Sequence, residues 1–174
     1  MNTPALRLRL ARESDLDAIV EIYNSTVPDR IATADLEPVS VDSRRAWFRE
    51  HSADRHPLWV AERNGRIAGW CSLQAFHVRS AYRATVEISV YVHAQERRAG
   101  VARSLIKHAL DAAPSLGVRN VLALIFGHNT PSLDLFTAFG FAPWGELPAV
   151  AELDGIERDV VILGLRITST SAGR

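Results

Sequence analysis

The chain of 174 residues lacks several features that would point to particular protein classes. It has a single cysteine, Cys71, so it can form neither an internal disulfide nor a four-cysteine zinc site. No apolar run approaches the roughly 18 residues of a membrane-spanning helix. The N-terminal residues MNTPALRLRLARESD have neither the long apolar region nor the small-residue cleavage site of a signal peptide, so a cytoplasmic location is expected.

An excess of charge of one sign is also missing, because 20 Lys and Arg balance 20 Asp and Glu. This balance argues against a protein that coats nucleic acid or an anionic membrane, and we expect neither partner. The six histidines show no metal-binding spacing, so we expect no metal. Composition and the absence of repeats predict a single domain over residues 1–167, followed by a flexible C-terminal tail over residues 168–174.

Hydrophobic periodicity predicts elements in the order β-α-α-β-β-β-α-β-α-β-β. Ser14 and Asp17 resemble a capping box at the start of the first helix. Asn64-Gly65 is typical of a hairpin turn, and residues 118–126 are apolar enough for a central strand. Hairpins in the middle and crossovers near the end indicate a mixed sheet with helices packed on it, in the α+β (mixed α/β) class.

The most informative stretch is residues 85–108, TVEISVYVHAQERRAGVARSLIKH. Residues 85–92 alternate as a strand that places Glu87 on one face. Small residues around Gly100 then lead directly into a helix, so backbone N–H groups and the helix N-terminus can approach an anion. Three arginines surround this point: Arg97, Arg98 and Arg103. The pattern predicts a phosphate or pyrophosphate site; the alternative is an ordinary loop with solvated arginines.

The pattern Arg97-x-x-Gly100-x-Ala102 after a strand resembles the pyrophosphate signature of the GNAT superfamily of N-acetyltransferases. Further motifs resemble its phosphinothricin/methionine sulfoximine acetyltransferase branch: Ile22-Tyr23-Asn24, Glu37-Pro38-Val39-Ser40, Arg45-Ala46-Trp47-Phe48, Ala81-Tyr82-Arg83, Thr85-Val86-Glu87, Ser89-Val90-Tyr91-Val92-His93 and Asn129-x-x-Ser132. The resemblance spans residues 6–165. It implies the GNAT fold, a curved mixed sheet that is splayed at the acetyl-CoA site and has helices on both faces.

The resemblance also implies acetyl-CoA as cosubstrate and no metal. The pantetheine arm would pair with backbone groups of one strand, and the pyrophosphate would contact the loop and helix that follow. The implied cofactor-binding residues are Val90, Tyr91, Val92, Arg97, Arg98, Ala99, Gly100, Val101, Ala102, Arg103, Asn129 and Ser132. Relatives in this branch are commonly dimers, so a homodimer is expected.

Glu87 is the residue that we expect to act as the general base, because an attacking amine must first lose a proton. The resemblance places the proposed base at this glutamate of Thr-Val-Glu. Partial burial would raise the pKa of its carboxyl group toward the useful range. The alternative is an exposed glutamate on a solvated face.

Substrate contacts are expected from the segment just before Glu87. The candidates are His77, Arg79, Tyr82 and Thr85. The guanidinium of Arg79 could hold the carboxylate of an amino-acid-like substrate. The family pattern has two arginines in this loop, and His77 replaces the first.

The sequence lacks the usual proton donor for the departing CoA thiolate. Phe136 stands where relatives carry a tyrosine or histidine proposed for this role, and phenylalanine cannot donate a proton. His128 is an alternative donor.

These features predict an N-acetyltransferase that passes acetyl from acetyl-CoA directly to the amine of a small amino-acid-like substrate of the phosphinothricin/methionine sulfoximine type. One alternative is acetylation of protein or peptide amines. Another is a non-catalytic acyl-CoA-binding module. Cys71 is expected to be a small core residue, and the four tryptophans to be core or pocket wall.

Overall fold

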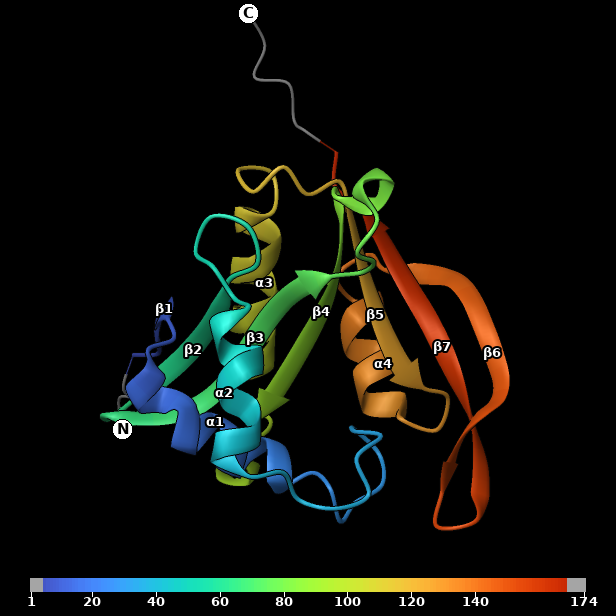
Figure 1. Cartoon of the computed structure of the whole chain (residues 1–174), viewed down its shortest axis with the longest axis horizontal. Coiled ribbons are helices and arrows are strands. Elements are labelled where there is room, and N and C mark those ends of the chain that lie inside the picture. Colours follow the sequence, from blue (N-terminus) through green and yellow to red (C-terminus); the bar gives the residue numbers. More distant parts are fainter. Residues whose placement is uncertain (1–4, 169–174) are drawn as a thin grey trace, which may run out of the picture.

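The computed structural model describes residues 5–168, and its helices and strands follow in the order predicted from the sequence (Figure 1). The elements are β1 (Arg7–Leu10), α1 (Leu16–Asn24), α2 (Val41–Arg49), β2 (Leu58–Arg63), β3 (Arg66–Ala75), β4 (Thr85–Val92), α3 (Val101–Ala112), β5 (Asn120–Phe126), α4 (Thr130–Thr137), β6 (Ala142–Leu153) and β7 (Ile156–Arg166). The predicted tail at residues 168–174 lies outside the described residues except for Thr168.

Seven strands form one sheet in the order β1-β2-β3-β4-β5-β7-β6. Tight turns join β2 to β3 and β6 to β7, so these pairs are antiparallel. The connection from β4 to β5 runs through α3, and these two strands are parallel. The predicted mixed sheet with helices on both faces is therefore confirmed.

The two faces of the sheet carry different cores because side chains alternate along each strand. On one face, the buried Leu73 and Val86 pack with Leu105 and Ile106 of α3 and with Phe136 of α4. On the other face, Trp70 packs with aliphatic residues of α1 and β2, and with aromatic residues of α2. Cys71 is fully buried in the first core, as expected.

The parallel strands β4 and β5 are paired over three residues and then separate. Thr85, Val86 and Glu87 pair with residues 120–122, and no pairing with β5 follows. Figure 1 shows the two strands spreading apart toward the end where residues 25–39 pass below them. The splay predicted for this sheet is therefore present, and it begins beside Glu87.

The predicted capping box at the start of α1 is wrong. Residues 13–15 form a short 3-10 turn, and α1 has no side-chain cap. The carboxylate of Asp15 instead accepts a hydrogen bond from the Arg12 N–H at 2.7 Å and two from the Arg9 guanidinium at 2.6 and 2.9 Å. The Asp15 carboxylate, held by Arg9, therefore satisfies the Arg12 N–H at the start of the 3-10 turn.

The β6–β7 hairpin is bent by an irregularity in its register between Leu147 and Ala151. Ala149 adopts a left-handed conformation, and its N–H donates to Asp159 Oδ1 at 2.7 Å. The hairpin also exposes several large apolar side chains: Trp144, Leu147, Val150 and Ile156. Within residues 5–168, no helix has the length and apolar character needed to cross a membrane.

Candidate functional site

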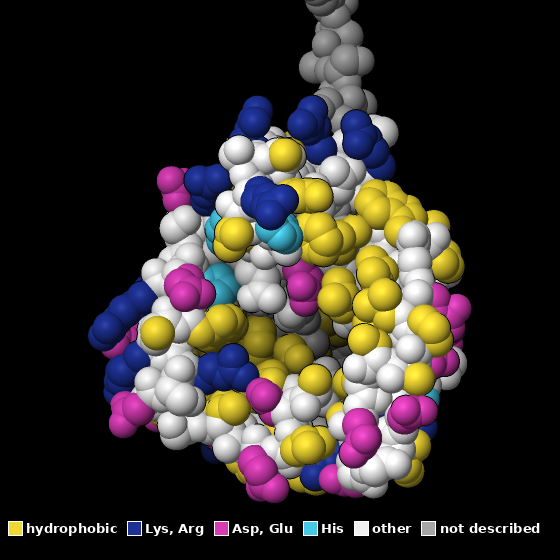
Figure 2. Space-filling model, turned by 45° about the vertical axis from the view of Figure 1, so that its right-hand side comes forward, with side chains coloured by type: hydrophobic (Ala, Val, Ile, Leu, Met, Phe, Trp, Pro, Cys, Tyr) yellow, Lys and Arg dark blue, Asp and Glu magenta, His cyan; other side chains and the backbone are white. Residues whose placement is uncertain are grey.

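Three adjoining cavities share lining residues and lie along β4, and we refer to them together as the groove. We call them the aromatic pocket, the fork cavity and the arginine groove, with volumes of about 230, 360 and 650 Å³. Tyr23, Ser89 and Tyr91 line both of the first two. Tyr91, Asn129 and Ser132 line both of the last two. Figure 2 shows a hollow on this face, with hydrophobic side chains along much of its wall.

The arginine groove ends at the start of α3. Gly100 is the N-cap of this helix in a left-handed conformation (φ 79°), and no side chain caps the helix. The first N–H groups of a helix have no partner within it, so those of residues 101–103 are available to an anion. Arg98 is also left-handed (φ 60°), which favours a turn that gathers backbone N–H groups. A Cβ atom on Gly100 would meet no protein atom within 4 Å, so the space above it is open.

Most residues predicted to bind the cofactor lie along this groove. The lining includes Val90, Tyr91, Val92, Arg97, Arg98, Gly100, Val101, Ala102, Arg103, Asn129 and Ser132. Ala99 is exposed and is not among the lining residues. Since β4 has left β5 by residue 88, part of its backbone edge faces the groove rather than another strand. The residues present therefore fit a long molecule with an anionic end.

Asn129 and Ser132 occupy the junction between the arginine groove and the fork cavity. Asn129 is buried and caps α4, because its Oδ1 accepts a hydrogen bond from the Ser132 N–H at 3.2 Å. Its Nδ2 donates to the carbonyl oxygen of Ile31 at 3.2 Å. Asn129 thus joins α4 to the segment of residues 25–39.

Glu87 lines the fork cavity at the last position of β4 that pairs with β5. Burial raises the pKa of its carboxyl group, and a side-chain hydrogen bond with Gln74 partly offsets that shift. Gln74 is its direct neighbour across the β3–β4 ladder. Desolvation makes the carboxylate a stronger proton acceptor than a solvated one, which suits a general base.

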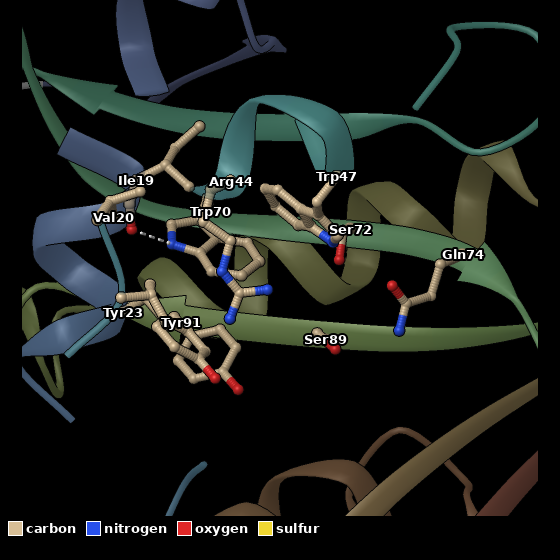
Figure 3. Close-up of a pocket in the computed structure, with 11 residues that line it drawn as sticks. Ile19, Val20, Tyr23, Arg44, Trp47, Trp70, Ser72, Gln74, Ser89 and Tyr91 are labelled. Carbon is tan, nitrogen blue, oxygen red and sulfur yellow. Dashed lines mark hydrogen bonds between the residues drawn. The ribbon is translucent and has the colours of Figure 1, made fainter. Parts of the chain in front are cut away.

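The aromatic pocket lies between β3, β4 and the two N-terminal helices. The rings of Trp70 and Tyr91 stack with centroids 4.6 Å apart, and Trp47 meets Trp70 edge-on at 5.7 Å. Trp70 Nε1 donates to the carbonyl oxygen of Ile19 at 3.1 Å, which fixes the indole (Figure 3). Arg44 reaches from α2 across the pocket toward β4 (Figure 3).

Hydrogen bonds fasten the segment of residues 25–39 along the groove. Tyr91 Oη donates to the carbonyl oxygen of Ala32 at 3.2 Å. The hydroxyl of Tyr23 donates to the Asp35 carboxylate and is hydrogen-bonded to Thr33. This segment therefore forms one side of both the fork cavity and the arginine groove.

The residues predicted to bind substrate lie away from the three cavities. His77, Arg79 and Tyr82 are exposed in the β3–β4 connection and line none of the three cavities. Their contacts are local, since the Arg79 N–H donates to His77 Nδ1 at 3.1 Å. Thr85 Oγ1 accepts a hydrogen bond from Asn120 Nδ2 at 3.1 Å, on β5. Their role in substrate binding stays a prediction.

The two positions considered for proton donation differ in access. Phe136 is buried, packs edge-on against Phe141 at 5.0 Å, and lines the fork cavity. The Nε2 atom of His128 lies 2.8 Å from the carbonyl oxygen of Arg30, and Nδ1 is buried without a partner among the described residues. His128 lines none of the three cavities, so its placement does not support the donor role.

Several groove residues were not among the site residues predicted from the sequence. They are Tyr23 and Arg44, the strand residues Ser72 and Gln74, and Ile31, Ala32 and Thr33 of the segment 25–39. Alternation along the strand at Arg66–Ala75 could have placed Trp70, Ser72 and Gln74 on one face. No local pattern could have placed Ile31 beside Asn129, because their contact joins residues 98 positions apart.

Comparisons with known proteins agree with this geometry. The model of the acetyltransferase (GNAT) family matches residues 16–141. The chain is 48% identical over 164 residues to YwnH of Bacillus subtilis, which carries the provisional name phosphinothricin acetyltransferase; the match covers 94% of this chain and 100% of YwnH. It is 33% identical to the L-amino acid N-acyltransferase MnaT of Escherichia coli, over 93% of this chain and 94% of MnaT.

A solved structure shows the same fold. It is the GNAT superfamily phosphinothricin acetyltransferase from Sinorhizobium meliloti in complex with AcCoA, with a TM-score of 0.89 and 29% identity. The match covers 97% of this chain and 92% of that one.

Proposed function

Because the chain belongs to the acetyltransferase (GNAT) family, we propose that it transfers acetyl directly to the amine of a small amino-acid-like acceptor. It is an acetyl-CoA-dependent N-acetyltransferase by family, and the proposal adds the acceptor class and the residues that act. The observation that carries the proposal is the position of Glu87. This half-buried carboxylate stands where the groove enters the fork between β4 and β5.

The arginine groove fits acetyl-CoA as the acyl donor. N–H groups at the start of α3 would bind the pyrophosphate, with Arg97, Arg98 and Arg103 adding positive charge. The free edge of β4 at Val90 to Val92 would pair with the pantetheine amides. Acetyl-CoA supplies the acetyl group as a thioester, and the sulfur leaves as a thiolate.

Glu87 would act on the acceptor. A protonated amine has no lone pair, so the carboxylate must first accept a proton from the ammonium group, directly or through a water. The freed lone pair then forms the N–C bond to the acetyl carbon as the C–S bond breaks, and the second proton that the nitrogen loses on becoming an amide passes to water. Glu87 keeps the proton until solvent removes it. Phe136 lines this cavity without a donor, so protonation of the leaving thiolate falls to water in this proposal.

A small acceptor is supported by two observations. The fork cavity and the aromatic pocket, of about 360 and 230 Å³, are together within the size range of a small-molecule site. The relatives include an L-amino acid N-acyltransferase and proteins named L-methionine sulfoximine/L-methionine sulfone acetyltransferase. A homodimer and a cytoplasmic location are also proposed. The exposed apolar residues of the β6–β7 hairpin support the homodimer.

The proposal is tested by incubating the purified protein with acetyl-CoA and a panel of acceptors. The panel holds amino acids, simple amines and short peptides with free N-termini. Release of free thiol is followed spectroscopically, and the product is identified by mass spectrometry. Turnover with amino acids and not with peptides is expected. Tight CoA binding without thiol release from any acceptor would show a non-catalytic binding module, and preference for peptides would replace the small-molecule proposal.

A further inference from the structure

Gln74 and Glu87 lie directly opposite each other in the ladder between β3 and β4. Opposed side chains of an antiparallel pair point to the same face, with Cβ atoms about 4.5–5.5 Å apart. Both side chains are half-buried, and a hydrogen bond joins the amide to the carboxyl group. Figure 3 shows the Gln74 amide nitrogen turned from β3 toward β4. The amide is therefore placed to donate to the carboxylate of Glu87.

Gln74 stands where the aromatic pocket meets the fork cavity. It lines the aromatic pocket, Glu87 lines the fork cavity, and Ser89 lines both. On the other side of Glu87, its partner on β5 is the buried Leu122, which has no polar side-chain group. A neighbouring strand can thus offer a side-chain donor from the β3 side and not from the β5 side. One carboxylate oxygen can accept from Gln74 while the other stays open to the fork cavity.

The fork cavity brings no other charge to Glu87. The other titratable side chains in its lining are Tyr23 and Tyr91. Burial raises the pKa of both hydroxyl groups, so both are neutral at pH 7. The segment of residues 25–39, β5, α4 and the β6–β7 hairpin add neutral side chains to the lining. Nothing in this cavity therefore competes with an amide that contacts the carboxylate.

The arginines closest to this region are engaged or turned away. Arg44 lines the adjacent aromatic pocket and pairs with Asp35 at 3.0 Å. Arg79 is exposed and lines none of the three cavities. No ion pair recorded within the described part of the chain includes Glu87. The neutral amide of Gln74 is thus the recorded partner of the carboxylate.

A neutral donor suits a carboxylate that must both ionise and accept a proton. A cation opposite Glu87 would stabilise the ionised form strongly and make it a weaker base. An apolar residue there would leave the carboxylate without a partner in a half-buried site, which favours the protonated form. An amide donates one hydrogen bond without adding charge, and it also restricts the rotation of a long side chain.

We propose that Gln74 is a positioning residue of the transfer reaction: its amide holds the Glu87 carboxylate ionised, with one oxygen directed to the acceptor amine in the fork cavity. This rests on the proposed function and adds the residue through which the base is held. Gln74 does not contact the reacting atoms. It acts through Glu87.

The contact is tested without turnover, by nuclear magnetic resonance of the carboxyl carbons in protein labelled with ¹³C-glutamate. The Glu87 signal is the one missing from Glu87→Gln, and its titration gives the pKa of this group in the absence of substrates. In Gln74→Met, which keeps the length and removes the donor, the pKa should rise. In Gln74→Lys, which places a cation opposite the carboxylate, it should fall. A structural defect alone would not shift the two variants in opposite directions.

Steady-state kinetics with the best acceptor should follow the same order. The decrease of kcat/KM at acidic pH reports protonation of the base in the free enzyme. For Gln74→Met this decrease should move to higher pH, so that kcat/KM at acidic pH is about 10–100-fold below wild type, because a hydrogen bond to a charged group is lost. For Gln74→Lys it should move to lower pH. KM for acetyl-CoA should not change, because Gln74 does not line the arginine groove.

The chain offers a matched control in its other glutamine. Gln95 is exposed and lines none of the three cavities, so Gln95→Met should leave the Glu87 titration and kcat/KM unchanged. If both Gln74 variants lose activity but the Glu87 pKa stays at its wild-type value, Gln74 is only part of the pocket wall and the proposal is overturned.

Failure of the proposed function gives a different result. If the Glu87 pKa shifts as expected but Glu87→Gln is as active as wild type, Glu87 is not the base, and the positioning role of Gln74 is overturned with it. If instead Glu87→Gln is inactive and the Glu87 pKa does not respond to Gln74→Met, the base stands and Gln74 does not hold it.

Discussion

Replacing Glu87 by glutamine tests the centre of the proposed reaction. The amide keeps the shape of the side chain and its ability to contact Gln74, but it cannot accept a proton at neutral pH. General bases typically contribute about 10²–10⁴ in rate, which corresponds to about 3–5 kcal/mol of activation free energy. We expect kcat/KM of Glu87→Gln at pH 7 to fall by this factor. CoA affinity should be unchanged, because Glu87 lines the fork cavity and not the arginine groove.

The pH dependence separates proton transfer from simple binding. An alkyl ammonium group with a pKa of about 8–10 leaves about 10⁻¹–10⁻³ of the amine free at pH 7. The variant depends on that free fraction, so the loss in its kcat/KM relative to wild type should shrink about tenfold for each unit that pH rises, up to the amine pKa. If Glu87 only anchored the ammonium group, the loss would appear in KM and would not recover at high pH. A variant as active as wild type at pH 7 would refute the general-base assignment.

The same substitution, which should lower activity, should not lower the stability of the fold at pH 7. Burial raises the pKa of the Glu87 carboxyl group, so the folded state favours its protonated form. Wild-type stability therefore falls as pH rises from the ordinary glutamate pKa through the raised value in the fold. Glutamine does not titrate. The melting temperature of Glu87→Gln should match or exceed that of wild type at pH 7, and the difference should shrink toward pH 4. A destabilised variant at pH 7 would mean that the ionised carboxylate is held by contacts stronger than its desolvation.

Three further predictions concern other parts of the molecule. Gly100→Asp should abolish CoA binding in isothermal titration, since a carboxylate would enter the space for the pyrophosphate. Arg98→Ala should weaken CoA binding less, because backbone N–H groups provide most of the contact. Unchanged CoA affinity in Gly100→Asp would contradict the anion site at the start of α3. Asp15→Asn should cost about 2–3 kcal/mol in denaturant unfolding at pH 7. Arg9 lowers the pKa of Asp15, so this contribution is present above the ordinary aspartate pKa and is lost as pH falls through the lowered value; a deficit that persists at pH 2 would contradict it. Light scattering at micromolar concentration should show a dimer that Trp144→Lys dissociates, and a wild-type monomer would end the dimer proposal.

The order of the elements was predictable because it depends on local information. Alternation over residues 85–92 and helical spacing after Gly100 reflect the backbone geometry of each element alone. The small residues around Gly100 indicated the loop that leads into α3, and the Asn64-Gly65 turn joined the expected strands. The Glu87 position followed from strand parity together with the family resemblance.

The start of α1 and the composition of the groove depended on contacts between distant residues. Asp15, and not Ser14, organises the first turn, because Arg9 on β1 is held between Asp15 and Glu62 of β2. Arg44 enters the aromatic pocket only because α2 packs across Trp70. No pattern in the neighbouring sequence predicts either arrangement.

The amino-acid sequence thus determined the elements, the parity of Glu87 and the loop before α3, since each of these depends on a few consecutive residues. The tertiary structure alone decided where β4 leaves β5, which segment borders the resulting groove, and which arginine lines the aromatic pocket. These features arise from the twist of the sheet and from pairs such as Asn129 and Ile31, 98 residues apart. A local sequence pattern cannot predict a contact between residues so far apart in the chain.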